Sequence, residues 1–163
     1  MELNGHPDLV PLAGIFLTIV GLSIIAGSFL PRLRKRAVPA GLILGAIATI
    51  VAGMKTVIVD PPTSLQLGSL AVAISVEIGA FVALMPRLHP RGPRAVTAGV
   101  IAIVGAHFIL MVPAFGWPIA ALGVLCVLNA ALLWRSSRYP ARAADALDGI
   151  LKLMFGVAMI AAG

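Results

Sequence analysis

From Ala95 to Trp134 the chain contains no Asp, Glu, Lys or Arg. As one straight helix this run would be about 60 Å long, twice the thickness of the hydrocarbon core of a membrane. The run is interrupted between Pro113 and Pro118, where proline and glycine are typical of a turn. We therefore expect a hairpin of two membrane-spanning helices in this region.

The composition of the whole chain agrees with a membrane protein. Hydrophobic residues make up 60% of the 163 residues and charged residues 11%, whereas soluble domains average about 45–50% and about 25%. These proportions exclude an ordinary soluble enzyme, a disordered protein and a nucleic-acid-binding module. Cys126 is the single cysteine, so it excludes an internal disulfide, and its apolar surroundings predict a packed thiol.

Six apolar segments have the length of about 20 residues that a helix needs to cross a membrane. Segments with proline, glycine or charged residues separate them. A cleaved signal peptide is not expected, because residues 1–8 contain no Lys or Arg. We predict an all-α fold, a compact bundle of six transmembrane helices in one domain over residues 1–163. The predicted spans are about 11–30, 37–59, 65–85, 95–112, 118–134 and 145–163.

Basic residues predict the orientation of the bundle. Ten of the twelve Lys and Arg residues fall in the segments after the first, third and fifth spans, and basic loops remain in the cytoplasm. Both termini are then predicted on the non-cytoplasmic side, with anionic membrane lipids as partners of the basic loops. The content of Ala, Gly, Arg and Val is typical of a high-GC bacterium, which implies the bacterial cytoplasmic (inner) membrane.

Small residues repeat at helical spacing in three of the spans. Such stripes allow helix backbones to approach closely, because lipid gives little hydrophobic drive for association. They predict either tight packing within the bundle or an interface between copies in a homo-oligomer. The stripes are Gly41, Gly45, Thr49 and Gly53; Ala71, Ser75, Gly79 and Ala83; and Gly149, Gly156 and Gly163.

Ionisable residues inside the spans are the main functional candidates, because each is costly at membrane depth. Glu77 lies near the middle of the third span, where it could serve as a proton or cation site, an acid catalyst, or a structural carboxyl. Lys152 follows Asp148 by four residues, which places both on one helix face. Lys152 is also a candidate partner of Glu77 across the bundle. Asp145 and Asp148 are expected in the first turn of the sixth span, as capping residues.

Three further polar residues lie within predicted spans. His107, in the fourth span, could carry protons or form a hydrogen bond with a neighbour. Asn129 in the fifth span is expected to make an interhelical hydrogen bond. Lys55 lies one turn from the end of the second span and could extend towards Asp60.

The sequence predicts no cofactor and no metal site. It contains no phosphate-binding loop and no H-E-x-x-H motif. A haem held by two histidines would need a second histidine in a span, but His6 and His89 lie outside the spans. A lysine and a carboxylate could suggest a retinal protein, but the chain has too few aromatic residues and one span too few.

One stretch of the chain carries a resemblance to a known group of proteins. The residues from His107 to Gly116, with Leu122-Gly123 and Asn129-Ala130, resemble a pattern in small uncharacterised bacterial membrane proteins with six spans. The resemblance covers the fourth and fifth spans and implies no catalytic or binding residue. The bacterial homologues of the Insig proteins are similar in architecture alone, as compact six-helix bundles.

These observations leave three functions open. The first is proton- or ion-linked transport through a carrier or channel, with Glu77 in the coupling or selectivity site. The second is a lipid- or sterol-binding protein that holds an apolar ligand between its helices. The third, an isomerase or cyclase with Glu77 as general acid, is the least favoured.

Overall fold

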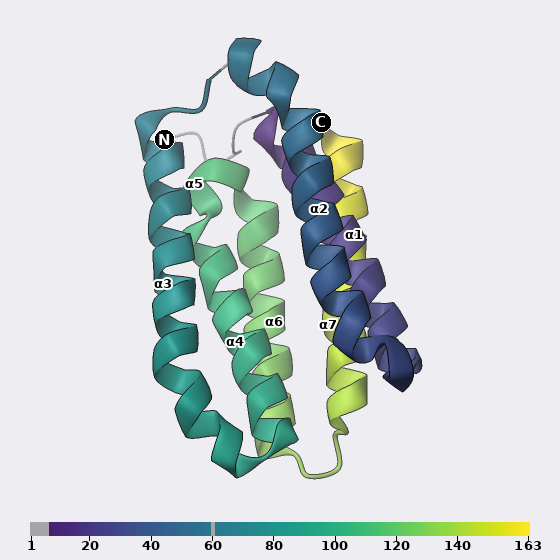
Figure 1. Ribbon diagram of the computed structural model, residues 1–163. Coiled ribbons are helices and arrows are strands. Elements are labelled where there is room, and N and C mark those ends of the chain that lie inside the picture. The colour runs from purple at the N-terminus through teal and green to yellow at the C-terminus, as the bar shows by residue number, and fades with distance from the viewer. Residues whose placement is uncertain (1–6, 60) are drawn as a thin grey trace.

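The computed structural model describes residues 7–59 and 61–163, which form helices and no strand (Figure 1). Six long helices follow one another in an up-and-down arrangement, and two short helical turns lie in their connections. The long helices are α1 (Leu9–Phe29), α2 (Pro31–Val59), α3 (Ser64–Leu88), α4 (Pro93–Leu110), α6 (Trp117–Arg135) and α7 (Ala141–Ala162); the short ones are η1 (His89–Arg91) and α5 (Val112–Phe115).

Five helices are long and apolar enough to cross a membrane. They are α1, α4, α6, the part Arg36–Met54 of α2, and Ser64–Arg91, which combines α3 and η1. α7 has a comparable length of 22 residues, but its charged side chains keep it outside this group by composition alone.

Two helices begin before the membrane spans predicted from the sequence. α2 begins at Pro31, so Arg32 and Arg36 lie in its first turns and not in a loop, and Leu30 alone separates α2 from α1. Proline suits the first position of a helix because it has no N–H group that needs a partner there. α7 begins at Ala141, four residues before the predicted start at Asp145.

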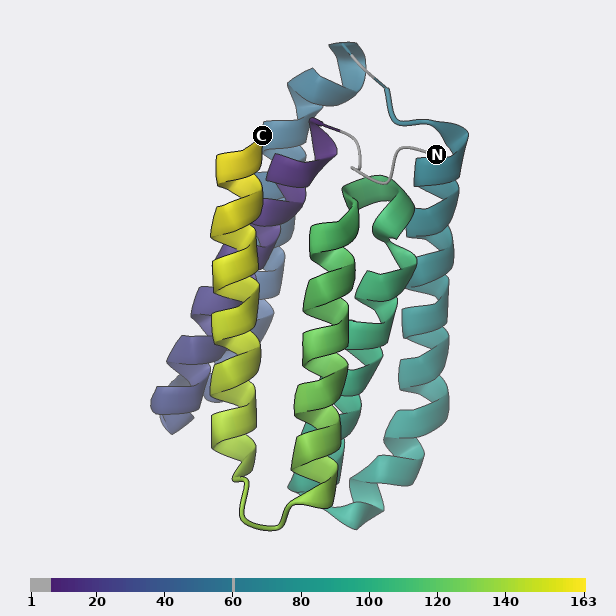
Figure 2. The ribbon, with the colours of Figure 1, turned by 180° about the vertical axis from the view of Figure 1, so that it is seen from behind.

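The helices form two groups (Figures 1 and 2). In the first group, α1 packs against α7 on one side and α2 on the other. In the second group, α4 packs against α6 and α3. Contacts of α6 and α4 with α7 join the two groups. Among the described residues, α2 packs closely against α1 alone.

Glycines bring the backbones of the first group into direct contact. A Cβ atom on Gly156 of α7 would lie 2.8 Å from the carbonyl oxygen of Gly14 and 2.7 Å from the amide nitrogen of Thr18, both in α1. Gly149 and Gly21 approach each other in the same way, about two turns further along the helices. Only glycine allows helices to come this close, so the stripe on the sixth predicted span packs within the bundle.

The other two stripes have different surroundings. The stripe on α2 faces α1, where Gly45 touches Phe16 and the Thr49 hydroxyl donates a hydrogen bond to the Leu12 carbonyl oxygen at 3.4 Å. The stripe on α3 has no such neighbour, because a Cβ atom on Gly79 would meet nothing within 4 Å. Intramolecular packing is therefore confirmed for two of the three stripes.

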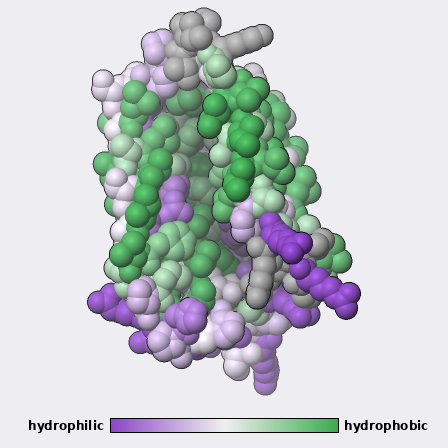
Figure 3. Space-filling model, viewed as in Figure 1, coloured by the Kyte–Doolittle hydropathy of each residue, from purple (hydrophilic) through white to green (hydrophobic). Residues whose placement is uncertain are grey.

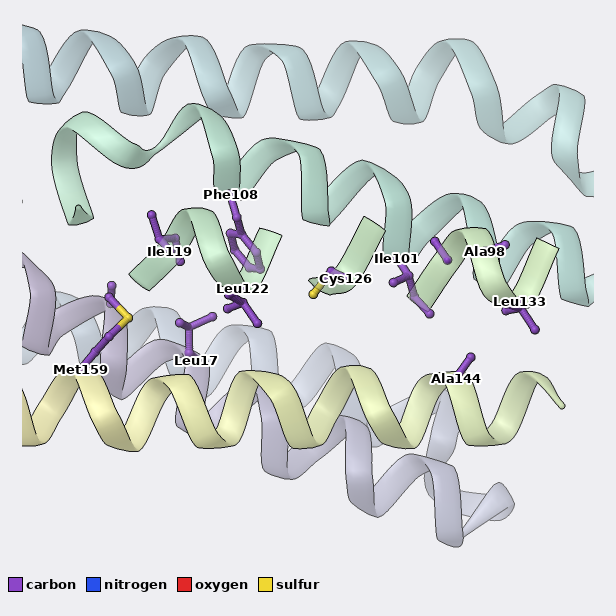
Figure 4. Close-up of a cluster of buried hydrophobic side chains, with 12 residues drawn as sticks. Leu17, Ala98, Ile101, Phe108, Ile119, Leu122, Cys126, Leu133, Ala144 and Met159 are labelled. Carbon is purple, nitrogen blue, oxygen red and sulfur yellow. The ribbon is translucent and has the colours of Figure 1, made fainter. Parts of the chain in front are cut away.

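Large apolar side chains fill the space between the two groups (Figure 4). Leu17 of α1, Phe108 of α4, Leu122 of α6 and Met159 of α7 are all buried there. Other apolar side chains cover the outer faces of α2 and α3, where Ile50 and Val82 are more than half exposed (Figure 3). This distribution, apolar both inside and outside, is the one expected of helices that face lipid.

Candidate functional site

Glu77 of α3 and His107 of α4 form an ion pair between the two helices. Glu77 Oε2 lies 2.5 Å from His107 Nδ1. The Glu77 side chain is 24% exposed and His107 is 8% exposed. Nδ1 has no hydrogen-bond partner of regular geometry among the described residues. The contact thus joins a carboxyl and an imidazole, and it is an attraction between opposite charges when His107 is protonated and Glu77 is ionised.

The position of Glu77 along α3 makes a carboxylate without a partner costly. Eleven residues separate it from Leu88, the last residue of the helix, which corresponds to roughly 16 Å at the helical rise. A glutamate side chain is too short to extend over this distance to water. Its contact with His107 therefore gives the carboxyl a polar partner at a depth where water is out of reach.

Asp148 and Lys152 form a second ion pair within α7. Asp148 Oδ1 contacts Lys152 Nζ, and the two residues are 5% and 3% exposed. Their separation of four residues places them one turn apart, as the sequence predicted. The Cys126 thiol of α6 donates a hydrogen bond to the same Oδ1 at 3.3 Å. Cys126 is packed as predicted, but it also makes this polar contact.

Phe108 lies between the two ion pairs. Lys152 Nζ is 5.7 Å from the centroid of the Phe108 ring, within the range of a cation–π contact. The ring of His107 meets the same phenyl ring edge-on, with centroids 5.4 Å apart and planes at 82°. The two ion pairs are therefore separated by a single aromatic side chain and lie in one continuous cluster.

Two of the predicted roles of these residues were wrong. Glu77 pairs with His107 and not with Lys152, because α3 packs beside α4 and has no close contact with α7 among the described residues. Asp145 and Asp148 do not cap α7, because the helix begins at Ala141 and its first turn contains no acidic residue.

Asn129 joins α6 to α7, which confirms the predicted interhelical hydrogen bond. Its Nδ2 donates to the Ala144 carbonyl oxygen at 2.9 Å, and its Oδ1 accepts from the Tyr139 hydroxyl at 2.8 Å. Tyr139 lies in the connection between the two helices, where burial raises the pKa of its phenol. The phenol thus remains a donor at neutral pH. Lys55 belongs to α2, but its side chain lies outside the described part of the structure.

Arg94 holds the connection between α6 and α7 in place. Its guanidinium donates to the carbonyl oxygens of Leu133 and Ser136, and to that of Tyr139 at 2.9 Å. The Leu133 carbonyl is one of those that the last turn of α6 leaves without a partner within the helix, so Arg94 ties the end of α6 to the connection that follows. The sequence assigned Arg94 to the basic loops alone, and no local pattern pointed to its contacts with residues so far along the chain.

A pocket of about 630 Å³ lies between the two groups of helices. It is near the end of the bundle at which residues 87–94 and 135–142 carry six arginines, which we call the basic end. Figure 3 shows a hollow between α2 and the helices of the second group. The walls include Ser28 of α1, Pro39 of α2, Thr97 of α4, and Asp145 and Asp148 of α7.

Sequence reasoning did not single out Phe108, which contacts members of both ion pairs, or Thr97, which lines the pocket. Phe108 was available as an aromatic next to His107, but an apolar residue in an apolar span carries no signal of its own. Thr97 lies in the first turns of α4 and looks like any small polar residue near a helix end. Among the described residues, no three His, Cys, Asp or Glu side chains come together as metal ligands.

The fold and the cluster thus define a helical bundle with five helices able to span a membrane and with paired ionisable residues in its interior. The chain belongs to a family of unknown function, DUF6609, whose model matches residues 11–163. No curated protein and no solved structure matches the chain significantly.

Proposed function

We propose that the protein is a small proton-linked transporter of the bacterial cytoplasmic membrane, with the Glu77–His107 pair as its proton-responsive site. One observation carries the proposal. A carboxylate in the middle of α3 meets an imidazole of α4 at 2.5 Å, and both groups can change charge in response to protons. Ionisable residues within apolar helices are rare and mark proton or ion pathways in many membrane proteins.

The proposal includes α7 as a sixth span, although five helices qualify by composition. Asp148 and Lys152 are nearly fully buried and in contact with each other. Pairing them removes most of the cost of placing α7 in lipid. With six spans, the basic end lies in the cytoplasm, and the start of α1 and the end of α7 lie on the opposite side.

Protonation at this site would act on the position of α3. Among the helices, α3 packs mainly against α4, with smaller contacts to η1 and α5. The Glu77–His107 attraction is lost when Glu77 is protonated or when His107 releases its proton. Proton uptake by Glu77 is therefore coupled to release of α3 from α4.

Ligand binding without transport is the second candidate. The pocket favours it, because its walls are mainly apolar and it lies between two groups of helices. A binding protein would keep this pocket occupied and would have no need for a titrating pair on α3 and α4. The two functions therefore differ in whether Glu77 is needed for movement of protons.

The test is proton flux in proteoliposomes that contain the purified protein and a trapped pH-sensitive dye. A potassium gradient with valinomycin supplies the driving potential. We expect Glu77→Gln to lower the protein-dependent flux at least about tenfold, because the amide cannot titrate. Asp8→Asn, a change of the same kind at an exposed residue outside α1, is the control and should retain the flux.

Two results would overturn the proposal. One is a wild-type flux no greater than that of protein-free liposomes, which would favour the ligand-binding alternative. The other is a flux that Glu77→Gln leaves unchanged, which would exclude Glu77 from the proton path.

A further inference from the structure

We infer that a groove along α4 at the basic end holds one acyl chain of an anionic phospholipid, whose phosphate is bound by Arg135. The inference goes beyond the proposed function, because it assigns a lipid partner to the bundle and does not involve the two ion pairs. The groove is also separate from the pocket between the two groups of helices, since the two share no lining residue.

Three helices of the second group form the groove. α4 lies between α3 and α6 (Figures 1 and 2), and residues of all three helices line the space. On the α3 side, Leu88 lies so close to Gly99 of α4 that a Cβ atom there would clash with Leu88 Cδ1. The remaining apolar lining consists of Ala98 and Ala102 of α4 and of Val127, Ala130 and Ala131 of α6.

The small side chains of α4 and α6 leave room for an apolar chain. The groove has a volume of about 350 Å³, at the lower end of the range of roughly 300–1,000 Å³ that is usual for small-molecule sites. A space of this size, with walls that are almost wholly apolar, suits part of one hydrocarbon chain better than a bulky or polar ligand.

The groove changes from charged to apolar along the helices. Arg135 is the last residue of α6 and lines one end of the groove. Val127, which also lines it, is eight residues earlier in α6, or about 12 Å deeper at the helical rise. A phospholipid in a membrane has the same order, with its charged headgroup at the surface and its hydrocarbon chains below.

Two tryptophans indicate the depth of the groove in the membrane. Trp134 lines the groove beside Arg135, and Trp117 begins the same helix; their exposed fractions are 52% and 60%. Their separation of seventeen residues corresponds to about 26 Å, close to the thickness of about 30 Å of the hydrocarbon core. Exposed tryptophans are typical of the two membrane surfaces. Arg135 is therefore expected at the level of the headgroups, with the groove extending from it into the hydrocarbon.

The charges around the end of the groove favour an anionic headgroup. Arg135 is the charged residue among those that line the groove, and the arginine-rich segments 87–94 and 135–142 contain no Asp or Glu. Among the described residues the Arg135 guanidinium has no acceptor, whereas those of Arg87 and Arg94 donate to carbonyl oxygens. An exposed guanidinium without an internal partner is well suited to a lipid phosphate, which it can bind through two hydrogen bonds.

The experiment uses the two tryptophans as reporters of lipid contact, because bromine atoms quench the fluorescence of a tryptophan that they touch. Trp117→Phe leaves Trp134, at the groove, as the single tryptophan, and Trp134→Phe leaves Trp117 as the control at the other end of α6. Each protein is placed in phosphatidylcholine bilayers that contain increasing amounts of phosphatidylglycerol or phosphatidylcholine brominated near the glycerol end of one chain.

Quenching gives the ratio of the binding constants for the two lipids at each tryptophan. At Trp134 we expect phosphatidylglycerol to bind at least about fivefold more tightly than phosphatidylcholine, whereas at Trp117 the ratio should stay within about twofold of one. Equal quenching of Trp134 by the two lipids would overturn the inference.

Arginine variants of the protein that retains Trp134 separate a site from general attraction to the basic end. Arg135→Gln should reduce the preference for phosphatidylglycerol to within about twofold of one. Arg142→Gln is the matched control, because it removes the same charge from an exposed residue at the basic end that does not line the groove. If Arg142→Gln lowered the preference as much as Arg135→Gln, diffuse attraction would replace the proposed site.

A pair of phenylalanine variants tests the groove itself. Ala131→Phe, at an exposed position that lines the groove, should fill the space and abolish the preference for phosphatidylglycerol at Trp134. Ala121→Phe, at an exposed position of α6 outside the groove, is the control and should keep the preference. A preference that survives Ala131→Phe would contradict binding of the chain in the groove. Because quenching reports lipid contact without proton movement, failure here is distinguishable from failure of the proposed function.

Discussion

α3 and α7 are both long helices that carry ionisable residues, but their environments are opposite. α7 turns Asp148 and Lys152 inward, and its glycines touch the backbone of α1. α3 packs mainly against α4, and most of its apolar side chains are exposed. Its single charged residue within the apolar part, Glu77, reaches across to another helix for a partner.

The difference separates a stabilising pair from a responsive one. Asp148 and Lys152 lie on the same helix, so no movement of helices can part them, and they contact each other in nearly complete burial. Glu77 and His107 lie on different helices, and the Glu77 side chain retains 24% of its exposure. We therefore expect α7 to respond to mutation with loss of stability and α3 with loss of function.

Removing the charge on α7 should have the largest effect on stability. In Lys152→Met the Asp148 carboxylate remains buried without its cation, and we expect a loss of about 3–5 kcal/mol in the free energy of unfolding. Denaturant titration in micelles measures it. The double variant Asp148→Asn with Lys152→Met should recover more than half of the loss. A single variant as stable as the wild type would contradict the assignment.

The close approach of α7 to α1 is expected to be the next most sensitive feature. In Gly156→Ala the new Cβ would lie 2.7 Å from the Thr18 amide nitrogen, so α1 has to shift. We expect a loss of about 1–3 kcal/mol in the free energy of unfolding, because overpacking strains the interface. Thermal unfolding of the two proteins under one set of conditions provides the comparison. An unchanged midpoint would mean that the helices are further apart than described.

Glu77→Gln should have a small effect on stability and a large effect on proton flux. The amide keeps the shape of the side chain and can still form a hydrogen bond with a neutral His107, so we expect the unfolding free energy to change by about 1 kcal/mol or less. Proton flux should nevertheless be lost. Measuring both quantities on one preparation decides the matter: a loss of stability as large as that of Lys152→Met would make Glu77 a structural residue like those of α7.

Gly79→Ala should have the smallest effect. The position is open, with nothing within 4 Å of the added Cβ, and alanine favours a helix over glycine by up to about 1 kcal/mol. The midpoint of thermal unfolding should therefore equal that of the wild type or be slightly higher. Gly79 and Gly156 each belong to a stripe of small residues. The contrast between their alanine variants therefore tests whether another helix packs against each stripe.

Much of the fold could be predicted from the sequence. The positions of the helices follow from the lengths of the apolar runs and from the prolines that interrupt them, and each predicted span overlaps a helix. The start of α2 differs from the prediction because Pro31, which is typical of a helix end, also suits the first helical turn. The start of α7 was missed because the charged residues of 141–148 resemble a loop.

The contacts between site residues could be predicted only where both residues lie close together on one helix. The contact of Asp148 with Lys152 follows from their spacing of four residues on one helix. The contact of Glu77 with His107 depends on which helices are neighbours, and equal apolar faces on all the spans gave no preference between α4 and α7. The pocket and Thr97 likewise depend on the angle between two groups of helices, which no local pattern records.

The pairing of α1 with α7 has a consequence for biosynthesis. α1 is made before the other described helices, yet its main partner is made only after α2 to α6 are complete. During that interval the glycines of α1 face lipid or a chaperone. If α7 is the sixth span that we propose, its charged residues allow it to enter the membrane favourably only when its neighbours are already assembled to receive it. Insertion of the last helix and closure of the bundle are therefore expected to be one cooperative event in the assembly of this protein.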